Sequence, residues 1–208
     1  MSGTTLSVSA VSKQSAAVPT DVIWRFSVDQ YHAIIRAGIL TEDDPVELLE
    51  GWLVTKMPKN PKHRVVTRLI RQALENLVAP GWYVDTQEPL TTADSEPEPD
   101  VMVVRGETRR YLDRHPGPQD VPLVIEVADS SLQRDRTLKK RLYAAAGILV
   151  YWIVNLIDNQ IEVYTDPSGP GDQPDYRYQQ NYGLTEDAIP VVIEGRAVGH
   201  LVVQDLLP

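Results

Sequence analysis

The sequence contains no cysteine and only four histidines among its 208 residues. Without cysteine the chain cannot form disulfides, bind zinc or an iron–sulfur cluster through thiolates, or use a cysteine nucleophile. The histidines lie too far apart for any paired-histidine zinc motif, at His32, His63, His115 and His200. A histidine-only metal site would therefore have to be assembled by the fold.

Long hydrophobic runs are also missing. No apolar run approaches the roughly 18 residues that cross a bilayer, and residues 1–20 lack the basic start and apolar centre of a signal peptide. We therefore expect no membrane partner and a cytoplasmic location. Residues 1–20 are rich in Ser, Thr and Ala without periodicity, which predicts a mobile N-terminal tail ahead of a single domain at 21–208.

Basic residues are in the minority, with 20 Lys and Arg against 29 Asp and Glu and a net charge of −9. This balance argues against a general nucleic-acid binder. However, 14 of the 20 basic residues fall in the segments 59–71, 105–114 and 134–141, which together hold only three acids. The distribution fits either a basic face on an acidic body or three ordinary solvated faces.

Hydrophobic patterning predicts a mixed α/β (α+β) fold. Helices are expected from Ser27, in a Ser-x-x-Gln capping box, to Gly38, from Asn60-Pro61 to Pro80-Gly81, and over about 132–146. Strands are expected at 46–49, 52–57, 82–86, 101–104, 123–127, 150–156, 160–165, 189–193 and 198–203. Strands on both sides of packed helices, with hairpins at the edges, indicate a mixed sheet flanked by helices.

Glu126 is the most informative single residue. It interrupts the aliphatic run 123–127, which has the composition of a strand buried on both faces. A buried carboxylate costs several kcal/mol unless a cation or strong hydrogen bonds compensate it. The partner is either a basic side chain in a structural ion pair, a metal ion, or a proton that the carboxyl group transfers.

Asp100 is the acid best placed to join Glu126. Glu96, Glu98 and Asp100 alternate with prolines in an extended segment, and only Asp100 adjoins the apolar strand 101–104. If the two strands are neighbours, the two carboxylates meet and repel unless a shared proton or a divalent cation lies between them. Oxygen-only ligation favours Mg²⁺ or Mn²⁺.

The helix that follows Glu126 supplies a lysine. At 100° per residue, Asp135 and Lys139 lie on the same inward stripe as Leu142. Arg136, Lys140 and Arg141 are expected to point away from the sheet. Lys139 therefore either reaches the carboxylates or forms an ordinary surface pair with Asp135.

Three further residues are candidates with open roles. Glu47 is either another metal-binding or water-orienting carboxylate or an edge charge. His63 fits a first-turn surface residue better than a catalyst, and Tyr143 fits an aromatic at the edge of the core with a hydrogen-bonded hydroxyl. No phosphate-binding glycine loop, nucleophile elbow or kinase signature is present.

These residues together resemble a known family. The segments Glu47-Leu48-Leu49-Glu50-Gly51, Pro99-Asp100-Val101, Glu126-Val127-Ala128-Asp129-Ser130-Ser131-Leu132 with Asp135, Lys139, Tyr143 and Gly147, and Tyr151-Trp152-Ile153-Val154 are similar to the Uma-two family of putative restriction endonucleases. The resemblance runs from about Phe26 to Leu207 and is most specific from Glu126 to Val154. It suggests the PD-(D/E)XK nuclease superfamily, which implies a restriction-endonuclease-like mixed sheet and Mg²⁺-dependent hydrolysis of DNA phosphodiester bonds.

The resemblance also implies roles for individual residues. Asp100, Glu126 and the main-chain carbonyl of Val127 would hold a cation, and Glu47 would bind a second ion or fix a water molecule. The superfamily places a lysine two residues after the Glu, where this chain has Ala128, so Lys139 would fill that space. Asp135, Tyr143 and His63 would support the site, and basic side chains would grip the nucleic-acid backbone, namely Arg64, Arg68, Arg71, Arg136 and Lys140. A homodimer is expected by analogy with enzymes that cut both strands.

Three functional hypotheses remain open on these grounds. The first is a metal-dependent DNA endonuclease, which the presence of Asp100, Glu126 and Lys139 favours. The second is a catalytically silent binding or regulatory module, which the net charge and Ala128 favour. The third is a carboxylate-based enzyme that acts on another phosphoester.

Overall fold

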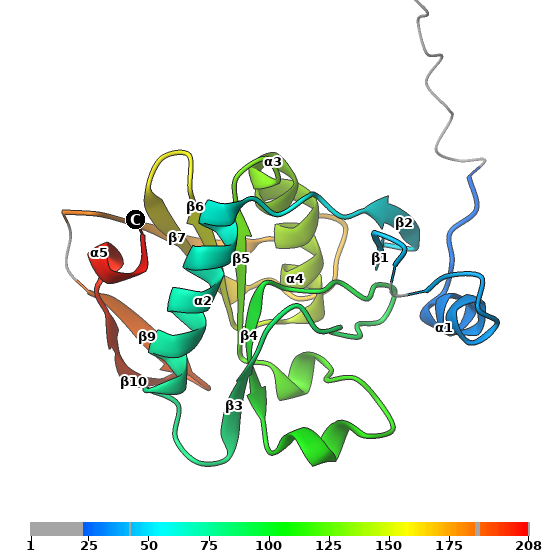
Figure 1. The fold of residues 1–208 in the computed structure, drawn as a ribbon, viewed down its shortest axis with the longest axis horizontal. Coiled ribbons are helices and arrows are strands. Elements are labelled where there is room, and N and C mark those ends of the chain that lie inside the picture. Colours follow the sequence, from blue (N-terminus) through cyan, green and yellow to red (C-terminus); the bar gives the residue numbers. More distant parts are fainter. Residues whose placement is uncertain (1–22, 42, 186–187, 208) are drawn as a thin grey trace, which may run out of the picture.

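The centre of the molecule is a six-stranded mixed sheet with the order β3-β4-β5-β6-β7-β8 (Figure 1). The computed structural model describes residues 23–41, 43–185 and 188–207. The strands are β3 (Trp82–Asp85), β4 (Val101–Arg105), β5 (Leu123–Ala128), β6 (Val150–Asn155), β7 (Gln160–Pro167) and β8 (Tyr176–Gly183). Only β5 and β6 pair in parallel. The predicted fold class is confirmed, whereas the expected tail at residues 1–20 lies outside the described residues.

Strand β5 is covered on both faces, as its continuous aliphatic composition predicts. Its odd-numbered side chains, such as Ile125, pack with helix α2 (Pro61–Glu75), and its even-numbered apolar side chains, such as Val124, pack with helix α4 (Lys140–Ala146). Figure 1 shows α2 and α4 on opposite sides of β5. Because side chains alternate along a strand, Glu126 belongs to the face covered by α4.

The α2 face carries additional elements from the C-terminal part of the chain. The hairpin of β9 (Ile189–Ile193) and β10 (Arg196–Leu201) and the short helix α5 (Val203–Leu206) contribute Ile189, Val191 and Leu206 to the same core as α2. Every helix in the described part of the chain is too short or too polar to cross a bilayer.

A separate hairpin positions the first acidic candidate. Strands β1 (Val46–Leu49) and β2 (Trp52–Thr55) are joined at Glu50 and Gly51, whose φ angles are 48° and 79°. A Cβ atom on Gly51 would lie 2.7 Å from the Cβ atom of Arg25, so this turn requires glycine. Helix α1 (Val28–Arg36) begins at Ser27 with the predicted capping box and lies beside this hairpin in Figure 1.

Several elements differ from the sequence prediction. The last predicted strand, 198–203, is observed as β10 at Arg196–Leu201, and Val203 instead begins helix α5. The helix expected over 132–146 consists of α3 (Leu132–Arg134), a π-helical turn η4 (Asp135–Lys139) and α4. Helix α2 ends at Glu75 with Asn76 as its cap, before the predicted Pro80-Gly81. Strand β8 is unpredicted because its interior is polar and exposed, and its pairing with β7 rather than its composition makes it a strand.

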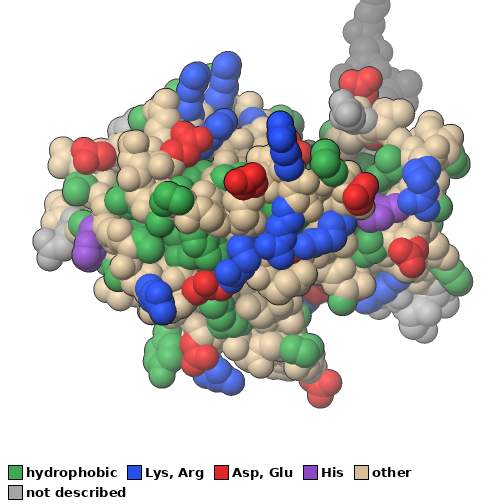
Figure 2. All heavy atoms as spheres, turned by 90° about the horizontal axis from the view of Figure 1, so that it is seen from below, with side chains coloured by type: hydrophobic (Ala, Val, Ile, Leu, Met, Phe, Trp, Pro, Cys, Tyr) green, Lys and Arg blue, Asp and Glu red, His purple; other side chains and the backbone are tan. Residues whose placement is uncertain are grey.

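The basic side chains are unevenly distributed over the surface. Figure 2 shows Lys and Arg side chains in a stripe across the face seen from below. In Figure 1 the segment between β4 and β5 lies on that lower side, and it contains the short helices η2 (Thr108–Tyr111) and η3 (Pro118–Asp120). Two arginines of this segment, Arg110 and Arg114, pair with the buried carboxylate of Asp120, so the positive charge of the segment is partly compensated within the chain.

Candidate active site

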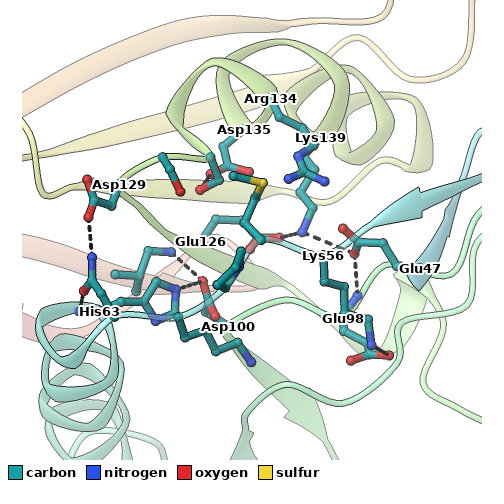
Figure 3. A pocket seen from close by; sticks show the side chains of 17 residues that line it. Glu47, Lys56, His63, Glu98, Asp100, Glu126, Asp129, Arg134, Asp135 and Lys139 are labelled. Atoms are coloured by element: carbon teal, nitrogen blue, oxygen red, sulfur yellow. Dashed lines mark hydrogen bonds and ion pairs between the residues drawn. The ribbon is translucent and has the colours of Figure 1, made fainter. Parts of the chain in front are cut away.

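A small hollow of about 70 Å³ lies at the C-terminal end of β5. Figure 3 shows that side chains enter it from the β1–β2 hairpin, α2, β5 and the helix after β5. Seven of the sequence-predicted residues line it, namely Glu47, His63, Asp100, Glu126, Val127, Asp135 and Lys139. The space suffices for an ion with a few water molecules.

Asp100 reaches the site because β4 and β5 are antiparallel neighbours. Val101 pairs with Ile125, so Asp100 lies opposite Glu126 just before β4 begins. One carboxylate oxygen, Oδ2, accepts hydrogen bonds from the Val127 amide at 2.9 Å and from His63 Nε2 at 3.0 Å. His63 is thus a buried partner of Asp100, and the expected surface position for it is wrong.

Glu126 and Lys139 form the centre of the site. The Lys139 ammonium donates to Glu126 Oε1 at 2.9 Å, and the Tyr143 hydroxyl donates to the same oxygen at 2.7 Å. Lys139 also lies 3.4 Å from Glu47 Oε2. The expected alternative of a surface pair between Lys139 and Asp135 is therefore wrong, since both side chains are buried and Lys139 pairs with the other two acids.

The π-helical turn does not disturb this inward stripe. A π-helix is only slightly wider than an α-helix, with i→i+5 in place of i→i+4 hydrogen bonds, so side chains four residues apart still lie on nearly the same face. Asp135 stays on this stripe, where the Ser131 hydroxyl donates to its carboxylate at 2.6 Å. The predicted positions of Asp135 and Lys139 relative to each other are confirmed.

The site has more negative than positive charge. Glu47, Asp100, Glu126 and Asp135 are all buried, and Lys139 is the buried cation among them. Burial raises the pKa of Glu126 to about 8, and the neighbouring carboxylates add to the rise while Lys139 opposes it. Burial likewise raises the pKa of Asp135. Four carboxylates therefore share one lysine in a poorly solvated space.

The donor set fits a hard divalent cation. In the described part of the chain no group of three or more His, Asp or Glu side chains has the arrangement of a ready metal site. Asp100 and Glu126 each accept the hydrogen bonds given above through one carboxylate oxygen. No described residue donates a hydrogen bond to the second carboxylate oxygen of either residue. The Val127 amide points toward the β4 side, so its carbonyl points there too, and Pro99 on that side has no N–H to donate. Two carboxylate oxygens and a carbonyl oxygen are thus available to an ion that prefers oxygen.

The structure divides the predicted backbone-binding residues into two groups. Arg64 and Arg68 are exposed on α2 and line a neighbouring basic hollow with Lys59. The other three have acidic partners in the chain, Arg71 with Glu75, Arg136 with Glu162 and Lys140 with Asp175. The expectation that Arg136 points freely away from the sheet is wrong, because the buried carboxylate of Glu162 on β7 binds its guanidinium with three hydrogen bonds.

The Uma2 family model, described as "Putative restriction endonuclease", matches residues 28–197. The chain belongs to the Uma2 family. Among solved structures, this Uma2 protein is similar to the crystal structure of a putative nuclease of the DUF820 group from Anabaena variabilis. The TM-score is 0.60 at 17% identity, over 87% of this chain and 97% of that one, which shows a shared fold. Among curated proteins, none matches the sequence.

Several residues of the Uma2 site were not singled out from the sequence. Lys56 and Glu98 form an ion pair of 2.5 Å at its edge, and Asn60 donates a hydrogen bond to Asp129. Arg134 also lines the hollow, with its guanidinium held by the Thr55 carbonyl at 2.8 Å. Its place in the basic segment 134–141, one residue before Asp135, is the signal that could have identified it.

The Arg136–Glu162 pair leads to a stability prediction for the Uma2 fold. Burial alone would raise the pKa of Glu162, but hydrogen bonds from Arg136, Tyr164 and Asn155 outweigh it and lower the pKa. A carboxyl group whose pKa is lowered by folding stabilises the protein at pH values above its unfolded-state pKa, which is near 4.3. This stabilisation is lost as the pH falls through the folded-state pKa. We expect Glu162→Gln to destabilise the protein by about 1–3 kcal/mol at pH 7, with a smaller difference below about pH 4.

Thermal unfolding of both proteins across this pH range measures the effect. Asp166→Asn is the matched control, because Asp166 lies on the same strand but pairs with Arg177 in an exposed position. A Glu162→Gln protein as stable as the native one at pH 7 would show that the pair contributes nothing.

Proposed function

We propose that this protein is a divalent-cation-dependent endonuclease that hydrolyses DNA phosphodiester bonds, with Mg²⁺ or Mn²⁺ as cofactor. The observation that carries the proposal is the group of four buried carboxylates around Lys139 at the end of β5. Membership of the Uma2 family supports it. A homodimer and a cytoplasmic location remain expectations from the sequence.

Each residue has a role that follows from its contacts. Asp100, Glu126 and the Val127 carbonyl would hold the cation, and Glu47 would hold a second ion or orient a water molecule. When bound, a divalent cation acidifies water and neutralises charge on the phosphate. Lys139 would donate to a phosphate oxygen as negative charge builds on it, from a position already fixed by Glu126 and Glu47.

Positioning residues keep these groups in place. His63 and the Val127 amide fix the orientation of the Asp100 carboxylate, and Tyr143 fixes that of Glu126. Burial raises the pKa of Tyr143 well above its ordinary value, so its hydroxyl stays neutral and donates a hydrogen bond to the Glu126 carboxylate. Such fixed orientations reduce the reorganisation needed during reaction.

Nicking of supercoiled plasmid tests the proposal. The native protein is expected to nick with Mg²⁺ or Mn²⁺ and not with EDTA, and Asp100→Asn is expected to remove the activity. Equal nicking by both proteins would indicate a contaminating nuclease. No nicking by the native protein, with DNA binding retained, would favour the catalytically silent binding module.

Salt dependence of DNA binding tests the proposed backbone contacts. Arg64 and Arg68 are exposed and have no acidic partner among the described residues, whereas Arg71 pairs with Glu75. We expect Arg64→Ala and Arg68→Ala each to weaken binding and to reduce the slope of log affinity against log salt by about 1. Arg71→Ala is the matched control from the same helix, and an equal effect in all three variants would contradict the assignment.

A further inference from the structure

A second and much larger hollow adjoins the candidate active site. It measures about 1190 Å³ and lies between α1 and the segments 87–98 and 111–119. Lys56 and Glu98 line both this hollow and the smaller one that contains Glu126. A DNA strand with one phosphate at the candidate site would therefore have a neighbouring nucleotide at this larger hollow, which is big enough for one.

The charge of the large hollow does not suit phosphate. Its lining includes five carboxylates against three Lys and Arg side chains. The basic hollow on α2, by contrast, contains Lys59, Arg64 and Arg68 and no acid. The sugar–phosphate backbone thus fits the α2 side, and an uncharged part of a nucleotide fits the large hollow.

Ring-bearing side chains line the large hollow. They are Tyr31, His32, Tyr111 and His115. The rings of His32 and His115 lie 6.2 Å apart at 61°. His32 is held in place because its Nε2 lies 2.8 Å from the buried carboxylate of Glu96, which also accepts from Thr91. Tyr31 is buried and the Arg114 guanidinium covers the ring of Tyr111, so His32 and His115 are the rings placed to stack on a nucleobase, whichever base is present.

Gln87 lies between the large hollow and the basic hollow on α2, and it lines both. Its φ of 60° is uncommon for a residue other than glycine, and the backbone is held there by a bond from its N–H to the Pro99 carbonyl at 2.9 Å. No described residue hydrogen-bonds its side-chain amide. A free amide, with both donor and acceptor, is suited to the edge of a base.

We propose that the large hollow is a base-binding subsite, which takes one unstacked nucleobase of the substrate strand, with Gln87 contacting the base edge. This inference rests on the proposed function, since it takes DNA as the substrate. Extracting a base from a duplex costs a few kcal/mol, and the cost is least where the base is already unpaired. A duplex with one mismatch should therefore bind more tightly than a fully paired one.

Binding of three labelled duplexes in EDTA tests the inference without any need for cleavage. The first is fully paired, the second has one central mismatch, and the third has a pair of abasic spacers at the same position. Fluorescence anisotropy should show the mismatched duplex bound about tenfold more tightly than the paired one by the full-length native protein. The spacer duplex should lose this advantage, because it offers no base.

Two variants localise the effect. Ala93→Trp places a large ring in the hollow from an exposed wall position, with Ala93→Ser as the matched control. Gln87→Gly removes the amide and suits the positive φ. We expect Ala93→Trp and Gln87→Gly to reduce the mismatch advantage at least threefold and Ala93→Ser to keep it, at unchanged melting temperatures.

The inference is overturned if native protein binds all three duplexes equally, if the spacer duplex keeps the advantage, or if both variants keep it. If one of these results is obtained while the native protein still nicks plasmid, the base-binding subsite is wrong and the proposed endonuclease function is unaffected. Conversely, a mismatch advantage that Ala93→Trp removes, in a protein that does not nick, supports the subsite and contradicts only the endonuclease.

Discussion

Replacement of Lys139 by Met is expected to reduce plasmid nicking at least about 100-fold. The Lys139 ammonium is buried between Glu126 and Glu47, and it is the group proposed to meet charge on the phosphate. Its loss also leaves buried carboxylates without a cation, which should destabilise the metal-free protein by about 3 kcal/mol at neutral pH. Part of that stability should return with Mg²⁺, because a bound cation restores positive charge to the same carboxylates.

Nicking rates and thermal unfolding with and without Mg²⁺ measure both effects. Lys140→Met is the matched control, since it removes a neighbouring lysine that pairs with Asp175 outside the hollow. If Lys139→Met nicks as fast as Lys140→Met, Lys139 has no part in the reaction.

Replacement of Asp100 by Asn is expected to separate activity from stability. Nicking should fall at least about 100-fold, because one of two proposed carboxylate ligands is lost. In EDTA, however, the variant should be at least as stable as the native protein, since the change removes one of four mutually repelling carboxylates. The side-chain carbonyl of the introduced asparagine can still accept from the Val127 amide, so the local structure should persist.

Melting temperatures with and without Mg²⁺ complete this test. Mg²⁺ should raise the melting temperature of the native protein and raise that of Asp100→Asn less. If the variant is destabilised in EDTA and Mg²⁺ raises its melting temperature as much as that of the native protein, Asp100 has a structural role only.

Local periodicity in the sequence predicted the central residues of the site. The aliphatic run of β5 indicated burial on both faces, and Glu126 within it indicated a compensating partner. Helical periodicity then placed Lys139 inward, and the structure confirms their contact at 2.9 Å. The meeting of Asp100 with Glu126 depended on one further condition, that β4 and β5 are neighbours, and they are.

Contacts set by the packing of distant elements were not predictable in this way. His63 meets Asp100 across 37 residues because α2 packs on β5, and nothing in the pattern around His63 indicates that. Arg136 is different. Its partner Glu162 lies among the apolar residues of strand β7. As for Glu126, a carboxylate in a buried strand needs a compensating partner, so the same argument would have predicted a cation beside Glu162.

The pairing of strands also limited the prediction. Strand β8 carries a polar interior of five exposed residues, which composition alone does not distinguish from a loop. Its tyrosines at 176 and 182 are buried and Tyr178 is exposed, and these three side chains were the apolar signal of an edge strand. The large hollow could not be predicted from the sequence either, because its walls come from several parts of the chain that are far apart in sequence.

Isothermal titration calorimetry of the metal-free protein with Mn²⁺ tests most directly whether the buried carboxylates form a cation site. The native protein is predicted to bind at least one ion per chain, and Asp100→Asn and Glu126→Gln should each weaken that binding at least about tenfold, with Arg71→Ala unchanged. Absence of binding to the native protein, or equal affinity in the two carboxylate variants, would contradict the cation site and the nuclease mechanism built on it.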